Sequence, residues 1–281
     1  MRIPTYNQMS QCKCEECGCA KKPTRKYGWK RDHHDHRDRM WMVGSFAAKT
    51  LPPIVDLRKK CPPVYNQGDI GSCTANAIAG AYQYDEINGH TKVDFTPSRL
   101  FIYWNERDME GTVDTDSGAA IRDGIKSINV TGVCSEALWP YGPGKFTAKP
   151  TAQCYAQAKG QKALAYARLD NTNLNQLKMS LAAGLPFVCG IQVYASFESD
   201  QVAKSGMVPM PASGEQLLGG HAIMCVGYDD AKKCFIMRNS WGPGWGLAGY
   251  FYIPYAYLTS TSLASDFWVV KKVSGEKATS S

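Results

Sequence analysis

A cysteine stands where a helix is expected to begin. Cys73 directly follows Gly71-Ser72, and apolar residues at helical spacing continue from it to Ile87. The free backbone N–H groups and the dipole at a helix N-terminus favour an anion, so they lower the pKa of a thiol placed there. Because the thiolate is the reactive form of cysteine, Cys73 is a candidate nucleophile.

Few histidines are present to act as its base. Beyond residue 50 the chain has two, His90 in a polar turn and His221 in the apolar segment GGHAIMCVGY. Asn239 follows His221 by 18 residues, on the next predicted strand across an Asp229-Asp230 turn. Antiparallel neighbours bring such side chains together, and an Asn carbonyl can hold an imidazole in one tautomer. We therefore predict that His221 and Asn239 act with Cys73, and that His90 is a surface residue.

A side-chain amide lies close to the cysteine along the chain. Gln67 precedes Cys73 by six residues. Its N–H group, together with the backbone N–H of Cys73, would form a two-donor oxyanion hole for a tetrahedral intermediate. These four residues suit acyl chemistry at a carbonyl carbon.

Three segments resemble the papain family of cysteine proteases. VDLRKKCPPVYNQGDIGSCTANA is similar to the start of its mature enzymes, GGHAIMCVGYD to its histidine strand, and RNSWGPGWGLAGYFYI to its asparagine motif. They occur in the family's order, and His221 follows Cys73 by 148 residues, within the family range of about 130 to 150. Asn239 lies 166 residues after Cys73, which an insertion around 207–218 would explain. Thr74 and Ile70 depart from the family, which usually has an aromatic residue and a cysteine there.

The resemblance implies a papain-like peptidase domain over residues 51–281 with an α+β fold. It implies a helical N-terminal lobe, mostly 67–184, and an antiparallel β lobe, mostly 185–273. The cleft between the lobes would bind a peptide or protein substrate, and no cofactor or metal would be needed. The resemblance implies that Cys73 is the nucleophile, that His221 acts first as base and then as acid, and that Asn239 orients the imidazole. It implies that Gln67 donates a hydrogen bond to the oxyanion, that Trp241 covers the His–Asn hydrogen bond, and that Trp245 lies on the leaving-group side of the cleft. Backbone groups of Ser117 and Gly118 would hydrogen-bond the bound peptide.

Residues 1–50 differ from the rest of the chain. They hold 11 Lys and Arg against 5 Asp and Glu, and so carry +6 of the net charge of +7. This short basic leader, with its YGW and DHRD segments, resembles the branch of the family that includes the bacterial enzyme xylellain. By analogy we predict that the leader lies across the cleft as an inhibitory pro-segment, with Tyr27 and Trp29 as apolar anchors.

Eleven cysteines are unevenly distributed. Four crowd into the leader, where they could bind a soft metal with nearby histidines, but C-x-C spacing is tighter than in structural zinc sites, and a reduced tail is favoured. In the body, Cys134 and Cys154 could pair in an oxidising compartment, and the others are expected to be small apolar residues. The leader residues concerned are Cys12, Cys14, Cys17, Cys19, His33, His34 and His36.

Local patterns predict mostly helices first and strands later, as in an α+β fold. In addition to the helix over residues 73–87, helices are expected to start at Thr96-Pro97 and to lie around residues 121–128 and 174–181. Five strand-like segments follow from residue 186 onward, separated by glycine and Asp turns. They are PFVCGIQVYA, HAIMCVGY, CFIMRNS, GYFYIPY and DFWVVKKV.

Composition excludes several classes of protein. With 281 residues, 44% hydrophobic and 20% charged, the chain is neither disordered, collagen-like nor coiled-coil. Its longest nearly apolar run, Pro186 to Ala195, is half of the roughly 20 residues that span a bilayer, so no membrane association is expected. The first residues lack the apolar core of a secretory signal, which favours an intracellular setting. The near-neutral body argues against a nucleic-acid partner, and we expect a monomer.

Two other functions are compatible with the same residues. The thioester formed on Cys73 could pass to an amine, which would make the protein an acyltransferase. Alternatively, the chain could be a catalytically silent binding or structural protein that keeps the fold. The intact set of four residues favours peptide hydrolysis.

Overall fold

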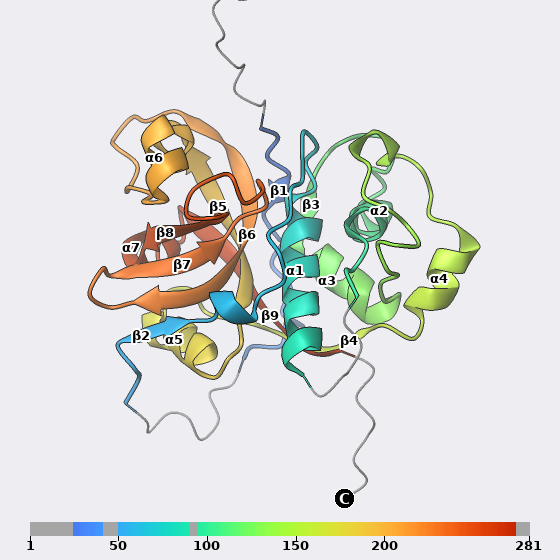
Figure 1. Ribbon diagram of the computed structural model, residues 1–281, viewed down its shortest axis with the longest axis horizontal. Coiled ribbons are helices and arrows are strands. Elements are labelled where there is room, and N and C mark those ends of the chain that lie inside the picture. Colours follow the sequence, from blue (N-terminus) through green and yellow to red (C-terminus); the bar gives the residue numbers. More distant parts are fainter. Residues whose placement is uncertain (1–24, 42–49, 90–94, 274–281) are drawn as a thin grey trace, which may run out of the picture.

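The structure is a computed structural model that describes residues 25–41, 50–89 and 95–273. A twisted antiparallel sheet forms one lobe and a group of helices forms the other, with one long helix standing between them (Figure 1). This is the two-lobed α+β architecture that the sequence predicts. His90 and the leader cysteines Cys12, Cys14, Cys17 and Cys19 lie outside the described residues.

Four helices follow one another in the first half of the domain. They are α1 (Cys73–Asn88), α2 (Arg99–Met109), α3 (Ile121–Val130) and α4 (Ala152–Ala158). Helix α1 begins at Cys73, as predicted, but Ser72 does not cap it with its side chain and instead hydrogen-bonds the hydroxyl of Tyr141 at 2.7 Å. Helix α2 begins after Thr96-Pro97, because the Ser98 side chain accepts the N–H of Phe101 and so caps the helix.

The sheet has seven strands, in the order β4-β9-β5-β6-β7-β8 with β2 paired to β6. The five strands expected from residue 186 onward all form. Two others had no clear local pattern: β4 comes from the region predicted to be mostly helical and pairs with β9, and β2 comes from the start of the body. The bounds are β2 Ile54–Asp56, β4 Ala163–Arg168, β5 Phe187–Tyr194, β6 Leu217–Asp229, β7 Cys234–Arg238, β8 Tyr250–Pro254 and β9 Ala264–Val273.

Short helices complete the β lobe, namely α5 (Leu174–Ala182), α6 (Asp200–Ser205) and α7 (Tyr255–Leu258). Helix α1 packs against the sheet on one side and against α2 and α3 on the other. Small residues permit this close packing: a Cβ added to Gly80 would lie 2.8 Å from the guanidinium of Arg238. The N-terminus of α1 is thereby held at the boundary between the two lobes.

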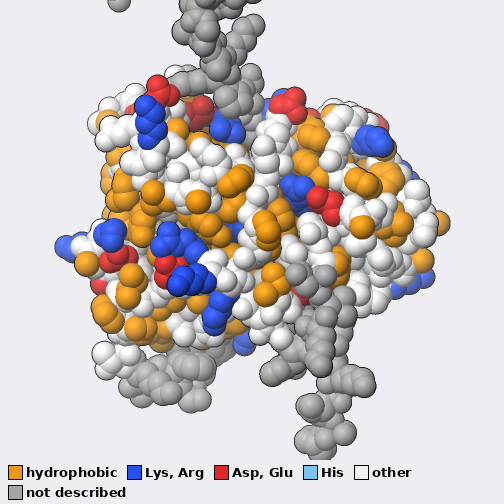
Figure 2. Space-filling view, in the orientation of Figure 1, with side chains coloured by type: hydrophobic (Ala, Val, Ile, Leu, Met, Phe, Trp, Pro, Cys, Tyr) orange, Lys and Arg blue, Asp and Glu red, His pale blue; other side chains and the backbone are white. Residues whose placement is uncertain are grey.

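Residues 25–41 also run along this boundary. Their strand β1 (Trp29–Lys30) pairs in parallel with β3 (Ala119–Ala120) of the helical lobe and lies beside β6 of the sheet (Figure 1). Basic and acidic side chains are interspersed with apolar ones on the face shown in Figure 2. Within the described part of the chain, no helix has the length and apolar character needed to cross a bilayer.

Candidate active site

His221 and Asn239 lie side by side on adjacent elements of the β lobe. His221 is on β6 and Asn239 directly follows β7, and the imidazole Nε2 is 2.9 Å from Asn239 Oδ1. The same oxygen accepts the backbone N–H of Ser240 at 2.8 Å, so it acts as an acceptor and Nε2 must carry the hydrogen. In a neutral ring the other nitrogen, Nδ1, then has a free lone pair. Among the described residues it has no hydrogen-bond partner, although it is buried.

Aromatic rings enclose this pair. The Trp241 ring stacks on His221 with centroids 5.0 Å apart and an interplanar angle of 27°. Trp245 meets Trp241 edge-on at 5.0 Å and stacks on Phe197 at 5.7 Å. Because these apolar rings keep water away, the hydrogen bond between His221 and Asn239 lies in surroundings of low dielectric constant.

Cys73 lies at the first turn of α1, beside the residue that follows His221. Its sulfur is within hydrogen-bonding reach of the backbone N–H groups of Ala222 on β6 and Gly28 on the leader. Helix α1 therefore brings the sulfur from the helical lobe to the strand that carries the imidazole. The thiol is completely buried.

Burial sets the ionisation of both groups. It raises the pKa of the Cys73 thiol to about 11, although the N–H groups of Ala222 and Gly28 oppose the shift. It lowers the pKa of His221 to about 4, helped by the charge of Arg25 and opposed by the bond to Asn239. Burial opposes the thiolate that the sequence predicts at the helix N-terminus, because it removes the water that would hydrate the charge. A neutral thiol and a neutral imidazole are favoured.

Gln67 is held from both lobes. Its Oε1 accepts the hydroxyl of Ser240 at 2.6 Å, and its backbone N–H donates to the Ser240 carbonyl at 2.8 Å. The side-chain Nε2 donates to the carbonyl of Ile70 at 3.0 Å and to that of Lys26, in the leader, at 3.3 Å. The amide therefore directs an N–H group toward a peptide carbonyl in the cleft.

The chain belongs to a known family. Residues 51–269 match the papain family cysteine protease domain. Xylellain, a cysteine protease from Xylella fastidiosa whose crystal structure is known, shares 44% identity, with a TM-score of 0.83 over 90% of this chain and 98% of that one. This chain is a papain-family cysteine peptidase.

Other relatives extend the similarity. An uncharacterized peptidase C1-like protein of Acanthamoeba polyphaga mimivirus is 47% identical over 244 residues, which is 83% of this chain and 78% of that protein. Cysteine proteinase 1 of Entamoeba histolytica is 29% identical over 71% of this chain and 62% of its own length. The resemblance stated from the three sequence segments is thus confirmed.

Leader residues contact the candidate catalytic residues of this papain-family domain. Arg25 lies over the Trp241 ring, 4.2 Å from its centroid, and Lys26 forms a 2.8 Å ion pair with Asp116. The Tyr27 hydroxyl hydrogen-bonds Glu198, and the Tyr27 ring lies edge-on to the imidazole of His221. Together with Gly28 and Trp29, these contacts bury the surroundings of the thiol.

The predicted substrate-binding residues are also beside the leader. Gly118 has φ +68°, and a Cβ added to it would lie 2.0 Å from the Gly28 carbonyl oxygen, so only glycine permits this backbone approach. Ala119, next to it, donates its N–H to that carbonyl at 2.7 Å. Ser117 instead directs its hydroxyl to Thr112 at 2.8 Å.

Several residues of the site carried no sequence signal. Asp266 and Glu198, which accept hydrogen bonds from Trp29 and Tyr27, lie in the β lobe more than 170 residues away from them along the chain. Ser240 could have been suspected from its place in the NSWG motif. The two carboxylates are recognised as part of the site only because the structure shows leader residues hydrogen-bonded to them.

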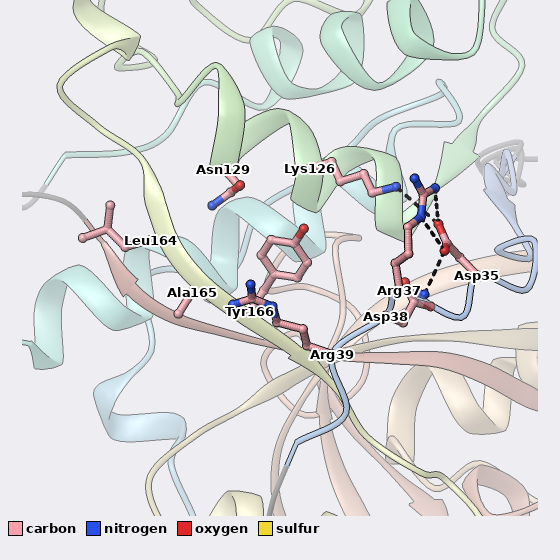
Figure 3. Close-up of a pocket in the computed structure, with 9 residues that line it drawn as sticks. All are labelled: Asp35, Arg37, Asp38, Arg39, Lys126, Asn129, Leu164, Ala165 and Tyr166. Atoms are coloured by element: carbon pink, nitrogen blue, oxygen red, sulfur yellow. Dashed lines mark hydrogen bonds and ion pairs between the residues drawn. The ribbon is translucent and has the colours of Figure 1, made fainter.

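A separate cavity of about 440 Å³ lies where the leader leaves the cleft and meets α3 and β4 (Figure 3). There Asp35 bonds Arg37 at 2.7 Å and lies 4.0 Å from Lys126, so the charges largely compensate one another. The leader thus contacts the body well beyond the cleft. The lining residues are Asp35, Arg37, Asp38, Arg39, Lys126, Asn129, Leu164, Ala165 and Tyr166.

The cysteines of the body that the structure describes are free thiols. Cys134 and Cys154, a candidate disulfide in the sequence, are both buried. Nowhere in residues 25–41, 50–89 and 95–273 do three or more His, Cys, Asp or Glu side chains form a group that could hold a metal ion.

Proposed function

We propose that the chain is an endopeptidase that hydrolyses peptide bonds through a thioacyl-enzyme, with Cys73 as nucleophile. The observation that carries the proposal is the His221–Asn239 pair, which leaves the Nδ1 lone pair free beside the strand position that touches the thiol. An imidazole fixed in this tautomer can take a proton from a thiol.

The reaction begins when Nδ1 of His221 accepts the thiol proton. The Cys73 sulfur then adds to the substrate carbonyl carbon, and the negative oxygen is stabilised by Gln67 Nε2–H and the Cys73 backbone N–H. As the C–N bond breaks, the imidazolium returns the proton to the leaving amine. A water, deprotonated by His221, then attacks the thioester and releases the acid and the free thiol.

We further propose that residues 1–50 keep the enzyme inactive as a zymogen. Gln67 already donates to the Lys26 carbonyl, and the backbone N–H of Gly28 lies within reach of the Cys73 sulfur. The leader therefore takes up the groups that would bind a substrate. Burial of the thiol also raises its pKa and so opposes formation of the nucleophile.

Labelling of Cys73 with an epoxysuccinyl inhibitor, after removal of residues 1–50, tests the catalytic proposal. We expect one label per chain, located on Cys73 by mass spectrometry, and no hydrolysis of a fluorogenic peptide by Cys73→Ala. A buried cysteine that serves as control, Cys189, should remain unlabelled. Full peptidase activity of Cys73→Ala would refute the assignment, and failure to label or to hydrolyse peptides even after removal of residues 1–50 would favour a silent binding protein.

A further inference from the structure

The indole of Trp29 fills a slot whose wall contains two glycines on the same face of the sheet. A Cβ added to Gly190 on β5 would lie 1.9 Å from the indole, and one added to Gly220 on β6 would lie 2.7 Å from it. Only 6% of Trp29 is exposed. Because neither glycine has a side chain, a planar ring can lie directly against this face of the sheet.

A buried carboxylate forms the floor of this slot. Asp266 Oδ2 accepts the indole Nε1–H of Trp29 at 3.1 Å and the backbone N–H of Asp32 at 2.8 Å. Its other oxygen, Oδ1, is bonded to the guanidinium of Arg168 at 2.9 Å. Both donors to Oδ2 therefore come from the leader, whereas the partner of Oδ1 belongs to the body.

The backbone of the β lobe is shaped to direct this carboxylate inward. The pairing of β5 with β9 changes register between Val188 and Gly190, which leaves an irregular segment of β9 around Asp266. Asp266 has φ +60°, a conformation that non-glycine residues rarely adopt. Bulges of this kind reorient side chains next to functional sites, and backbone strain is commonly found there.

The slot opens next to the candidate nucleophile. Gly220 directly precedes His221, and Gly190 pairs across the sheet with Ala222, whose N–H reaches the Cys73 sulfur. A peptide bound at Cys73 therefore has a side chain in position to enter the slot once Trp29 has left it.

We propose that Asp266 is a specificity-determining residue, which selects substrates that place a tryptophan side chain in the slot vacated by Trp29. This inference rests on the proposed peptidase function. When the leader leaves, Asp266 Oδ2 loses both of these donors. A substrate indole restores one donor, whereas a phenyl ring fills the same space and leaves the carboxylate unsatisfied.

Charge at the floor of the slot disfavours the other large side chains. A Lys or Arg side chain would bring its cation against the Arg168 guanidinium, which already holds Oδ1. An acidic side chain would meet the Asp266 carboxylate itself. A planar and neutral group with an N–H at its edge satisfies the slot best.

Binding of small aromatic compounds to full-length Trp29→Gly tests the slot without any turnover. Indole and benzofuran have nearly the same shape, but only indole has an N–H group. By isothermal titration calorimetry we expect indole to bind at least about 10-fold more tightly than benzofuran. Equal affinities, tighter binding of benzofuran, or no binding of either compound to the folded variant would overturn the proposal.

Peptide hydrolysis by the same variant then separates the inference from the proposed function. In fluorogenic peptides that differ only by Trp or Phe at one position, we expect a position at which kcat/KM favours Trp by about 10-fold or more. Hydrolysis without such a preference at any position would refute the role of Asp266 and leave the peptidase assignment intact. Indole selectivity in a chain that hydrolyses no peptide would refute the peptidase instead.

Discussion

Removal of one leader side chain should activate the full-length protein. Trp29→Ala leaves the rest of the leader unchanged but empties the slot beside Gly190 and Gly220 and breaks the bond to Asp266. If residues 25–41 inhibit by occupying the cleft, this substitution weakens docking of the leader and exposes Cys73.

The size of the effect follows from the burial of Trp29, which is 6% exposed. Truncation of a buried Trp to Ala costs about 3–5 kcal/mol, and each 1.4 kcal/mol is a factor of ten. The docking equilibrium should therefore shift toward the open form by about two to three and a half orders of magnitude. The hydrolysis rate rises with the open fraction until the leader is fully displaced.

The assay is the initial rate of hydrolysis of a fluorogenic peptide, measured on intact chain whose mass is checked before and after. We expect Trp29→Ala to be at least about 10-fold faster than the wild type. Arg37→Ala is the matched control, because Arg37 also belongs to the leader but is exposed and bonds only to Asp35 among its described hydrogen-bond partners. Unchanged activity in folded Trp29→Ala, or equal activation by Arg37→Ala, would refute inhibition through the slot.

Three further predictions concern the reacting groups. In the Trp29→Ala background, Asn239→Ala should lower kcat by about 10- to 100-fold with little change in KM, because the imidazole loses its 2.9 Å bond; a change in KM alone would contradict this. Gln67→Ala in that background should lower kcat by about 10²- to 10³-fold if its amide stabilises the oxyanion, and a loss of under threefold would exclude that role. Alkylation of Cys73 in the wild type, followed by peptide mass spectrometry, should rise as the pH approaches the thiol pKa of about 11, because a buried thiol ionises only at high pH. In Trp29→Ala, hydration of the sulfur favours the thiolate, so alkylation should rise at a lower pH than in the wild type. Identical pH profiles of alkylation for the two proteins would show that the leader does not raise the thiol pKa.

Much of the site was predictable because its signals are local. A helix start next to Cys73 and two strands joined by the Asp229-Asp230 turn are encoded by neighbours in the sequence. The turn sets β6 and β7 in antiparallel register, and this register brings Asn239 to His221. The three family segments contain these same elements, so fold and family could be stated before the structure.

Other features lacked such local signals. Strand β4 (Ala163–Arg168) alternates poorly and became a strand only because β9 offers it a partner. The side chain of Ser72, at the N-cap position of α1, does not cap the helix and hydrogen-bonds Tyr141, 69 residues further along. In both places a tertiary contact outweighed the propensity of the segment.

The sequence by itself determined the family and selected the candidate residues, since type, order and spacing point to Cys73 and His221. Only the tertiary structure decided their ionisation and their surroundings. Burial raises the pKa of the Cys73 thiol, although the backbone N–H groups of Ala222, Gly28 and Thr74 oppose the shift. Asp266 meets Trp29 across 237 residues of chain, and no local pattern records a contact made by packing at such separation.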